Sequence, residues 1–162
     1  MRQIATVLVL VALGVSSGCA PAEVGGDYTV NLTNGENGCN FDNWTVGDTT
    51  TGVPLVVTQN EDQVQLDANG TGGVALDVVL GSSIWNGQVA GNNVTAALIG
   101  SRSANMGGCT YTVTVDLDAS VDGDVIEGQL IWRPVTNMHA DCGVLEGCQT
   151  LQTFNGLRPP TP

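Results

Sequence analysis

Alternation of apolar and polar residues dominates this chain, and helical periodicity is almost absent. The clearest run covers residues 111–117, where Tyr, Val and Leu alternate with Thr and Asp, and residues 28–33 and 74–80 repeat it. A period of two, built from β-branched and aromatic residues, predicts strands with one buried and one solvated face. The same criterion predicts further strands at residues 39–45, 53–59, 63–68, 84–90, 94–99, 125–132 and 148–154. We therefore expect about eight to ten strands.

Short turn signals separate these strands, namely Asn60-Glu61-Asp62, Asn69-Gly70, Gly91-Asn92, Asp122-Gly123 and Asn155-Gly156. Such short connections imply antiparallel neighbours in a meander, because parallel pairing needs long crossovers. Gly87 and Gly128 lie inside otherwise regular strands, where they fit the tight curvature of a barrel. The predicted fold is an all-β antiparallel meander barrel that resembles lipocalin-like barrels by pattern alone. A two-sheet β-sandwich is the alternative.

The first twenty residues have the pattern of an export signal. Arg2 precedes an apolar run at residues 4–15, and small residues then lead to Cys19. The run is too short to cross a bilayer. Its end, Ser-Ser-Gly-Cys, resembles the lipobox of bacterial lipoproteins, although Ser16 stands where that family usually has Leu. An unmodified secreted protein is the alternative.

The resemblance to lipoproteins implies a location and a set of boundaries. In that family the cysteine, here Cys19, is acylated and becomes the first mature residue, and Ala20 after it favours the outer membrane over the inner one. We therefore expect a signal peptide at residues 1–18, a lipid-anchored tether at 19–26, one barrel domain at 27–158 and a proline-rich tail at 159–162. The expected location is the cell envelope.

Four cysteines remain after Cys19, which is an even number in an oxidising compartment. They allow three pairings. The favoured pairing joins Cys142 to Cys148 across a short glycine-containing loop and Cys39 to Cys109 across a long one. A zinc site is disfavoured, because the four thiols lack paired C-x-x-C spacing.

Composition narrows the possible chemistry. The formal net charge is −12, with four arginines and no lysine, which excludes ordinary nucleic-acid binding. His139 is the only histidine, and Asp141 could orient it, but a lone loop histidine is more often a solvated group than a catalyst. We expect no catalytic residue and no cofactor. A hydrolase built on two carboxylates, with Asp118 and Asp124 as candidates, is the residual alternative.

Residues 118–124 match the first half of a calcium loop, with oxygen-bearing side chains at the first, third and fifth positions and Gly at the sixth. The second half fails, because Gln129 stands where a bidentate Glu should be. A tight hairpin with aspartates facing water is the preferred interpretation, so no metal is predicted.

Three tryptophans complete the candidate residues. Trp132 shares an inward strand face with Ile126 and Leu130, and Trp85 is assigned to the core, whereas Trp44 lies in a polar stretch and is expected to be partly exposed. Core packing is favoured over a ligand platform for all three.

Two classes of function are compatible with this sequence. In the first, the barrel is a non-enzymatic module that binds a small apolar ligand or an envelope partner. In the second, it is a structural surface lipoprotein with a filled core. The state of the barrel interior distinguishes them, because eight strands enclose either packed side chains or one small ligand.

Overall fold

The computed structural model describes residues 21–159, and the described chain forms nine strands, one α-helix and one 3₁₀ turn. The predicted signal peptide, Cys19 and the last three residues lie outside this range. The elements are β1 (Gly26–Asn37), β2 (Thr49–Asn60), β3 (Gln63–Ala68), α1 (Gly70–Leu80), β4 (Ile84–Ala90), β5 (Asn93–Ile99), β6 (Ala104–Met106), β7 (Cys109–Asp122), β8 (Val125–Thr136), η1 (Ala140–Cys142) and β9 (Thr150–Leu157).

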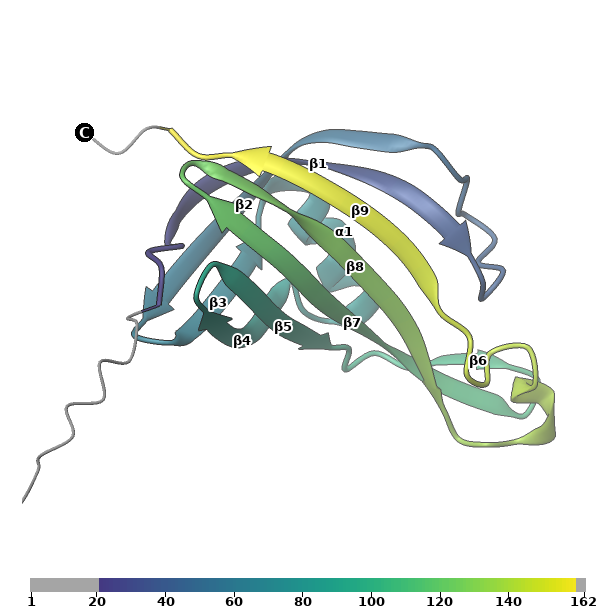
Figure 1. Ribbon diagram of the computed structural model, residues 1–162. Coiled ribbons are helices and arrows are strands. Elements are labelled where there is room, and N and C mark those ends of the chain that lie inside the picture. Colours follow the sequence, from purple (N-terminus) through teal and green to yellow (C-terminus); the bar gives the residue numbers. More distant parts are fainter. Residues whose placement is uncertain (1–20, 160–162) are drawn as a thin grey trace, which may run out of the picture.

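These strands form a closed antiparallel barrel (Figure 1). The sheet order is β5-β4-β3-β2-β1-β9-β8-β7-β6, and an additional pairing of β5 with β7 closes the ring. The short strand β6 pairs only with the start of β7 and lies outside the ring. The predicted all-β meander barrel is therefore confirmed, and the sandwich alternative is wrong. Within residues 21–159 no helix has the length and hydropathy needed to cross a membrane.

One end of the barrel, which we call the closed end, carries the tight hairpins β2–β3, β4–β5 and β7–β8. Residues 21–25 seal it. Val24 is fully buried there, and its carbonyl accepts a hydrogen bond of 2.9 Å from the Tyr28 hydroxyl. The Ala22 N–H donates to the Gly91 carbonyl in the β4–β5 turn. Arg158 adds a further tie, because its Nε lies 3.2 Å from Asp124 in the β7–β8 turn.

The opposite end, which we call the open end, carries the longer connections, and two disulfides join them. Cys39, between β1 and β2, bonds Cys148, between β8 and β9. Cys109 at the start of β7 bonds Cys142 in η1. Two disulfides among these four cysteines were predicted, but the favoured pairing was wrong. Sequence proximity suggested joining Cys142 to Cys148. In the barrel the start of β9 lies beside the end of β1, and the end of β8 lies beside the start of β7, so Cys148 meets Cys39 and Cys142 meets Cys109.

The segment predicted as a strand at residues 74–80 is instead the helix α1. Its apolar residues are nearly continuous, so they fit a strand and a helix equally well. Glycines near both ends accommodate the helix. Gly81 ends the helix in the left-handed conformation, with φ of 83°, and its N–H donates to the Asp77 carbonyl. A Cβ at Gly73 would overlap the Ala68 carbonyl, so only glycine lets the first turn rest on the end of β3.

The predicted strand at residues 39–45 is also wrong, because this segment is a series of turns. The Asn37 side chain shapes the first of them. Its Oδ1 accepts from the Phe41 N–H at 2.8 Å, and its Nδ2 donates to the Phe41 carbonyl at 2.9 Å. These local hydrogen bonds take the place of the backbone hydrogen bonds that a strand would make with its neighbours.

Gly87 and Gly128 occupy equivalent places in the barrel wall. Gly87 pairs with Ala96 on β5, and Gly128 pairs with Ala119 on β7. At either glycine a Cβ would overlap backbone atoms of the neighbouring strand. The absence of both side chains therefore allows the close interstrand approach that a tightly coiled barrel requires.

The interior near the closed end is filled. Tyr28 and Ile126 are almost completely buried there, together with valines from five strands. In the described chain the only fully buried polar residue is Thr150, and no charged residue is buried. The acidic residues that give the chain its charge thus lie outside the barrel core, as the alternating pattern predicts.

Candidate ligand-binding cavity

The half of the barrel toward the open end is hollow. A cavity of about 390 Å³ lies there, which is within the range of small-molecule sites in proteins. Its walls are inward-facing apolar residues of seven strands and of α1, joined by Trp44 from the β1–β2 connection and by a few neutral polar groups. The lining residues are Val30, Leu32, Trp44, Thr50, Val53, Leu55, Ala68, Thr71, Gly72, Ala75, Leu76, Val79, Trp85, Leu117, Leu130, Trp132, Gln152 and Phe154.

The deep wall of the cavity consists of buried side chains. Leu55, Leu117 and Phe154 are each at most 6 % exposed, and Trp85 closes the wall beside them. The indole N–H of Trp85 donates to the Val115 carbonyl at 3.0 Å, so this polar group is satisfied by the barrel itself. No charged side chain lines the cavity. The surface offered to a ligand is therefore neutral and mainly apolar.

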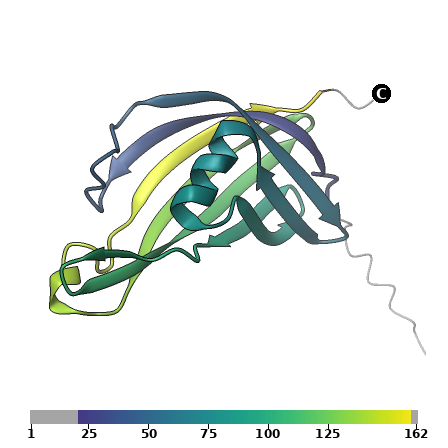
Figure 2. The same cartoon turned by 180° about the vertical axis from the view of Figure 1, so that it is seen from behind.

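Helix α1 forms one side of the mouth. Figure 2 shows it over the interior of the barrel, next to β2, and it packs against β2 and β3. Leu76 points its half-buried side chain to the core, while Val79 lines the cavity although it is 63 % exposed. Because Val79 belongs both to the cavity wall and to the surface, the cavity reaches solvent beside this helix.

Two tryptophans form the opposite side of the mouth. The rings of Trp44 and Trp132 meet edge to face, with centroids 6.0 Å apart and planes at 72°. Trp44 comes from the β1–β2 connection, and its indole N–H donates to the Gly35 carbonyl at 3.0 Å. Trp44 is partly exposed and Trp132 faces inward, as predicted. Their shared position on the cavity, however, was not predicted, because the polar neighbours of Trp44 gave no sign of it.

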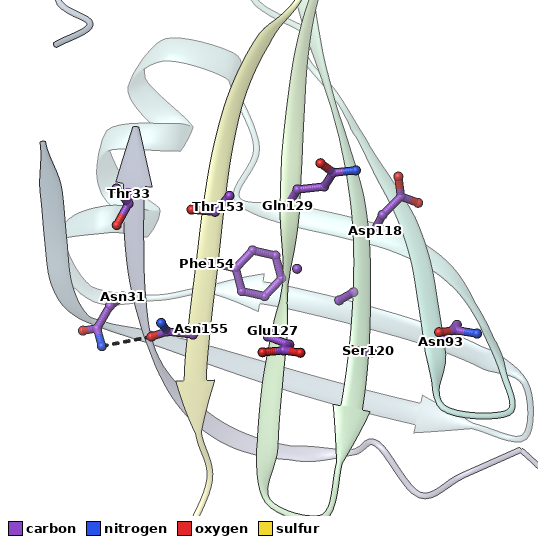
Figure 3. A pocket seen from close by; sticks show the side chains of 12 residues that line it. Asn31, Thr33, Asn93, Asp118, Ser120, Glu127, Gln129, Thr153, Phe154 and Asn155 are labelled. Atoms are coloured by element: carbon purple, nitrogen blue, oxygen red, sulfur yellow. Dashed lines mark hydrogen bonds between the residues drawn. The ribbon is translucent and has the colours of Figure 1, made fainter. Parts of the chain in front are cut away.

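The outer face of the barrel has two further hollows of about 610 Å³ each, but both are shallow and open to solvent. Figure 3 shows the one that crosses β1, β9, β8, β7 and β5. Asn31, Asn155, Glu127, Ser120 and Asn93 follow one another there in register across the five strands. They point outward, and Asn31 donates to Asn155 at 3.4 Å. These hollows are open troughs of solvated side chains, so the interior cavity is the better candidate site.

The predicted calcium half-loop is not a loop. Asp118 and Ser120 lie on strand β7 and pair with Gln129 and Glu127 of β8, and only Gly123 and Asp124 form the turn. Oxygen atoms on an extended strand cannot wrap around an ion in the way a calcium loop does. The hairpin interpretation is therefore confirmed. Among residues 21–159 no group of three or more His, Cys, Asp or Glu residues is placed to hold a metal.

His139 and Asp141 lie together, but in a structural arrangement. The Asp141 N–H donates to His139 Nδ1 at 3.2 Å, which caps the 3₁₀ turn η1. The Asp141 carboxylate accepts the Gly108 N–H at 2.7 Å. Both side chains are about half exposed, at 52 % and 50 %, and neither lines the cavity. The structure thus gives this pair a role in shaping the open-end loops.

Comparison with protein-family models, with curated proteins and with solved structures finds no match to this chain. Its function has to be inferred from its own residues.

Proposed function

We propose that this protein is a non-enzymatic binding module of the cell envelope that holds a small apolar ligand inside its barrel. The observation that supports this proposal is the charge-free cavity of about 390 Å³ at the open end. A structural lipoprotein with a filled core, the alternative from the sequence, needs no such space. Protein interiors are packed with few voids larger than a water molecule, so a cavity this large favours binding over a filled core.

The distribution of ionisable groups favours binding over catalysis. The cavity wall has no acid, base or nucleophilic cysteine, and general acid–base catalysis needs such a group within hydrogen-bond reach of the substrate. Asp118 belongs to the outer trough instead, and Asp124 forms an ion pair with Arg158. These two carboxylates are therefore not placed to act together on a ligand in the barrel.

We further propose that the chain reaches the envelope through its lipobox-like segment and is anchored by an acylated Cys19. The tether would then leave the barrel at its closed end, where Ala22 is hydrogen-bonded to the β4–β5 turn. The mouth lies at the other end. A protein anchored in this way would present its cavity away from the membrane, toward ligands in the surrounding compartment.

The binding proposal is tested by obstructing the mouth at α1. We expect Ala75→Trp to abolish binding of a neutral fluorescent probe, N-phenyl-1-naphthylamine, because Ala75 lines the cavity and its exposed position tolerates a large side chain. The matched control is Val78→Trp, on the same helix at an exposed position that does not line the cavity. Both are made in the Cys19→Ser protein, which carries no acyl chain that could occupy the site. Equal binding by the two variants would contradict the proposal.

A further inference from the structure

Methionine and histidine side chains lie together at the tip of the open end. The chain has three methionines and one histidine, and Met1 belongs to the predicted signal peptide. The two other methionines, Met106 at the end of β6 and Met138 just after β8, lie in the connections around the start of β7, as does His139. We call Met106, Met138 and His139 the thioether cluster.

The strand register places the two methionines level with each other. Met106 is the partner of Cys109 in the β6–β7 hairpin. On the other side of β7 the Asn137 N–H donates to the Thr110 carbonyl at 2.9 Å, so Met138, one residue further on, lies level with Cys109. Because neighbouring strands are about 4.8 Å apart, the two methionine backbones are separated by about 10 Å. Two long, flexible thioether side chains can meet across that distance at one bound ion.

His139 lies against the turn that follows Met106. A Cβ on Gly108 in this turn would lie only 2.5 Å from His139 Cε1, so the imidazole ring covers the turn directly. The Gly108 N–H donates to the Asp141 carboxylate at 2.7 Å, and the Gly108 carbonyl accepts from Asn137 Nδ2 at 3.1 Å. These bonds, together with a disulfide between the same two segments, hold the histidine beside the β6–β7 hairpin.

Both methionines are accessible to an ion from solvent. Met138 is 86 % exposed and Met106 is 42 % exposed, so burial in the core does not explain their position. Met138 also has a φ of 59°, a left-handed conformation that is uncommon for residues other than Gly, Asn and Asp. Unfavourable backbone conformations of this kind are concentrated at functional sites in proteins.

Thioether sulfur binds few metal ions, which narrows the chemistry of such a site. Calcium and magnesium take oxygen ligands, and zinc takes thiolate, imidazole or carboxylate. Thioethers instead select soft ions such as Cu(I), for which imidazole is also a suitable ligand. The formal net charge of −12 favours the approach of any cation.

The surroundings of His139 favour one ring nitrogen as the metal ligand. Nδ1 accepts the Asp141 N–H at 3.2 Å and lies 3.5 Å from the Asp141 carboxylate, whereas Nε2 takes part in neither contact. When Nε2 binds a metal, the ring proton is on Nδ1, and the Asp141 carboxylate is in place to accept it. A carboxylate in this position commonly orients histidine ligands of metals.

From these observations we propose that the thioether cluster binds one soft monovalent metal ion, with Cu(I) as the candidate in the envelope, through the sulfurs of Met106 and Met138 and through Nε2 of His139. None of these residues lines the barrel cavity, so this site is independent of the proposed binding of an apolar ligand.

The test measures Cu(I) binding by competition with the chelator bicinchoninate, and Ag(I) binding by calorimetry in chloride-free buffer. The Cys19→Ser protein is used, because its other four cysteines are disulfide-bonded and no thiol then competes for the metal. We expect one equivalent of either ion to bind. Met106→Leu and Met138→Leu should each weaken binding at least roughly tenfold, since even residues that only orient a metal ligand contribute that much.

Val144→Leu is the matched control. Val144 is an exposed apolar residue in the β8–β9 connection at the same end of the barrel, and its replacement should leave metal affinity unchanged. NMR gives a direct readout of the ligands. Ag(I) should shift the ¹³C-methyl resonances of Met106 and Met138 and the ¹⁵N resonance of His139 Nε2, while Nδ1 keeps a proton.

The outcomes separate this proposal from the proposed function. Absence of both Cu(I) and Ag(I) binding, or unchanged affinity in both methionine variants, would overturn the site. Tighter binding of Zn²⁺ than of Ag(I) would overturn its soft-metal character. Ala75→Trp should bind Ag(I) as the parent does, and the methionine variants should still bind N-phenyl-1-naphthylamine, so either proposal can fail without the other.

Discussion

At the scale of single residues, Arg158 shows how one side chain can hold three segments together. Its guanidinium bonds the Asp124 carboxylate, the Gly123 carbonyl and the carbonyls of Glu23 and Gly25. The same group lies 5.6 Å from the centre of the Tyr28 ring, within cation–π range. A planar group with five donors suits this task, since it reaches several carbonyls at once.

We expect Arg158→Ala to lower the free energy of unfolding by about 2–3 kcal/mol, because it leaves several carbonyls at the closed end without their donor. Arg158→Lys should restore little, since an ammonium cannot reproduce the fork. Urea denaturation measures both. Arg133→Ala is the control, because its ion pair with Asp116 is about 40 % exposed and should contribute under about 1 kcal/mol. An equal loss in both variants would contradict the assignment.

Titration of the Tyr28 hydroxyl makes the stability of the fold depend on pH in the alkaline range. Burial raises the pKa of its hydroxyl above the ordinary value, an effect that Arg158 opposes. The folded state therefore keeps this proton at pH values where the unfolded chain releases it. Stability from this group is fully present below pH 10 and is lost as the pH rises through the folded pKa.

We predict that Tyr28→Phe lowers the free energy of unfolding at pH 7 by about 1 kcal/mol, because the Val24 carbonyl loses its donor. The variant should also show a smaller decrease in stability between pH 9 and 11 than the parent protein. Urea midpoints across that interval measure the difference. Parallel curves for the two proteins would show that Tyr28 does not titrate in this way.

At the scale of elements, the disulfides stabilise the open end of the barrel and the tight turns stabilise the closed end. The hairpin turns and residues 21–25 hold the closed end, whereas the open end consists of long connections that the two disulfides brace. Cys109, Cys142 and Leu145 also form a small buried cluster of their own, apart from the main core. The cross-links thus fix the loops around the mouth, where the barrel has the least packing of its own.

The disulfide connectivity predicts how much each bond contributes to the free energy of unfolding. The Cys39–Cys148 bond spans 109 residues and Cys109–Cys142 spans 33, so the chain-entropy model assigns about 5 and about 4 kcal/mol to them. Replacing the first pair by Ala should therefore lower the midpoint of urea unfolding more than replacing the second. Mass spectrometry of unreduced peptides tests the pairing directly. Recovery of a Cys142–Cys148 peptide would contradict it.

At the scale of the whole molecule, the barrel is polar outside, acidic, sealed at one end and hollow at the other. The sealed end is also where the N-terminal segment joins the barrel, so the proposed anchor would lie at the end opposite the proposed binding site. Because of this separation, a change to the N-terminal tether should not affect ligand binding in the cavity.

The proposed anchor gives the corresponding prediction. The natural protein should enter the detergent phase of a Triton X-114 partition, and Cys19→Ser should move to the aqueous phase, because the thiol that accepts the acyl chain is gone. Ser17→Ala, two residues earlier, is the control and should stay in the detergent phase. The Cys19→Ser protein should still bind the fluorescent probe. Unchanged partitioning after Cys19→Ser would contradict the lipoprotein proposal.

Much of the fold was predictable because its signals are local. Alternation identifies a strand wherever one face is buried, as in β7 and β8, and short turns with Gly and Asn force antiparallel neighbours. Trp85 and Ile126 could be assigned to the core from their strand faces alone. An even number of cysteines after the predicted export signal was likewise enough to expect two disulfides.

Tertiary structure decided the features that depend on contacts between distant segments. The apolar run of α1 has no intrinsic preference that separates helix from strand, and its packing on β2 and β3 made the choice. Disulfide partners were set by which strand ends are neighbours in the barrel, not by the spacing of the cysteines along the chain. The cavity depends on volume left unfilled among residues from seven strands and a helix. Sequence alone determines which side chains face inward, whereas the space between them exists only once the barrel has closed.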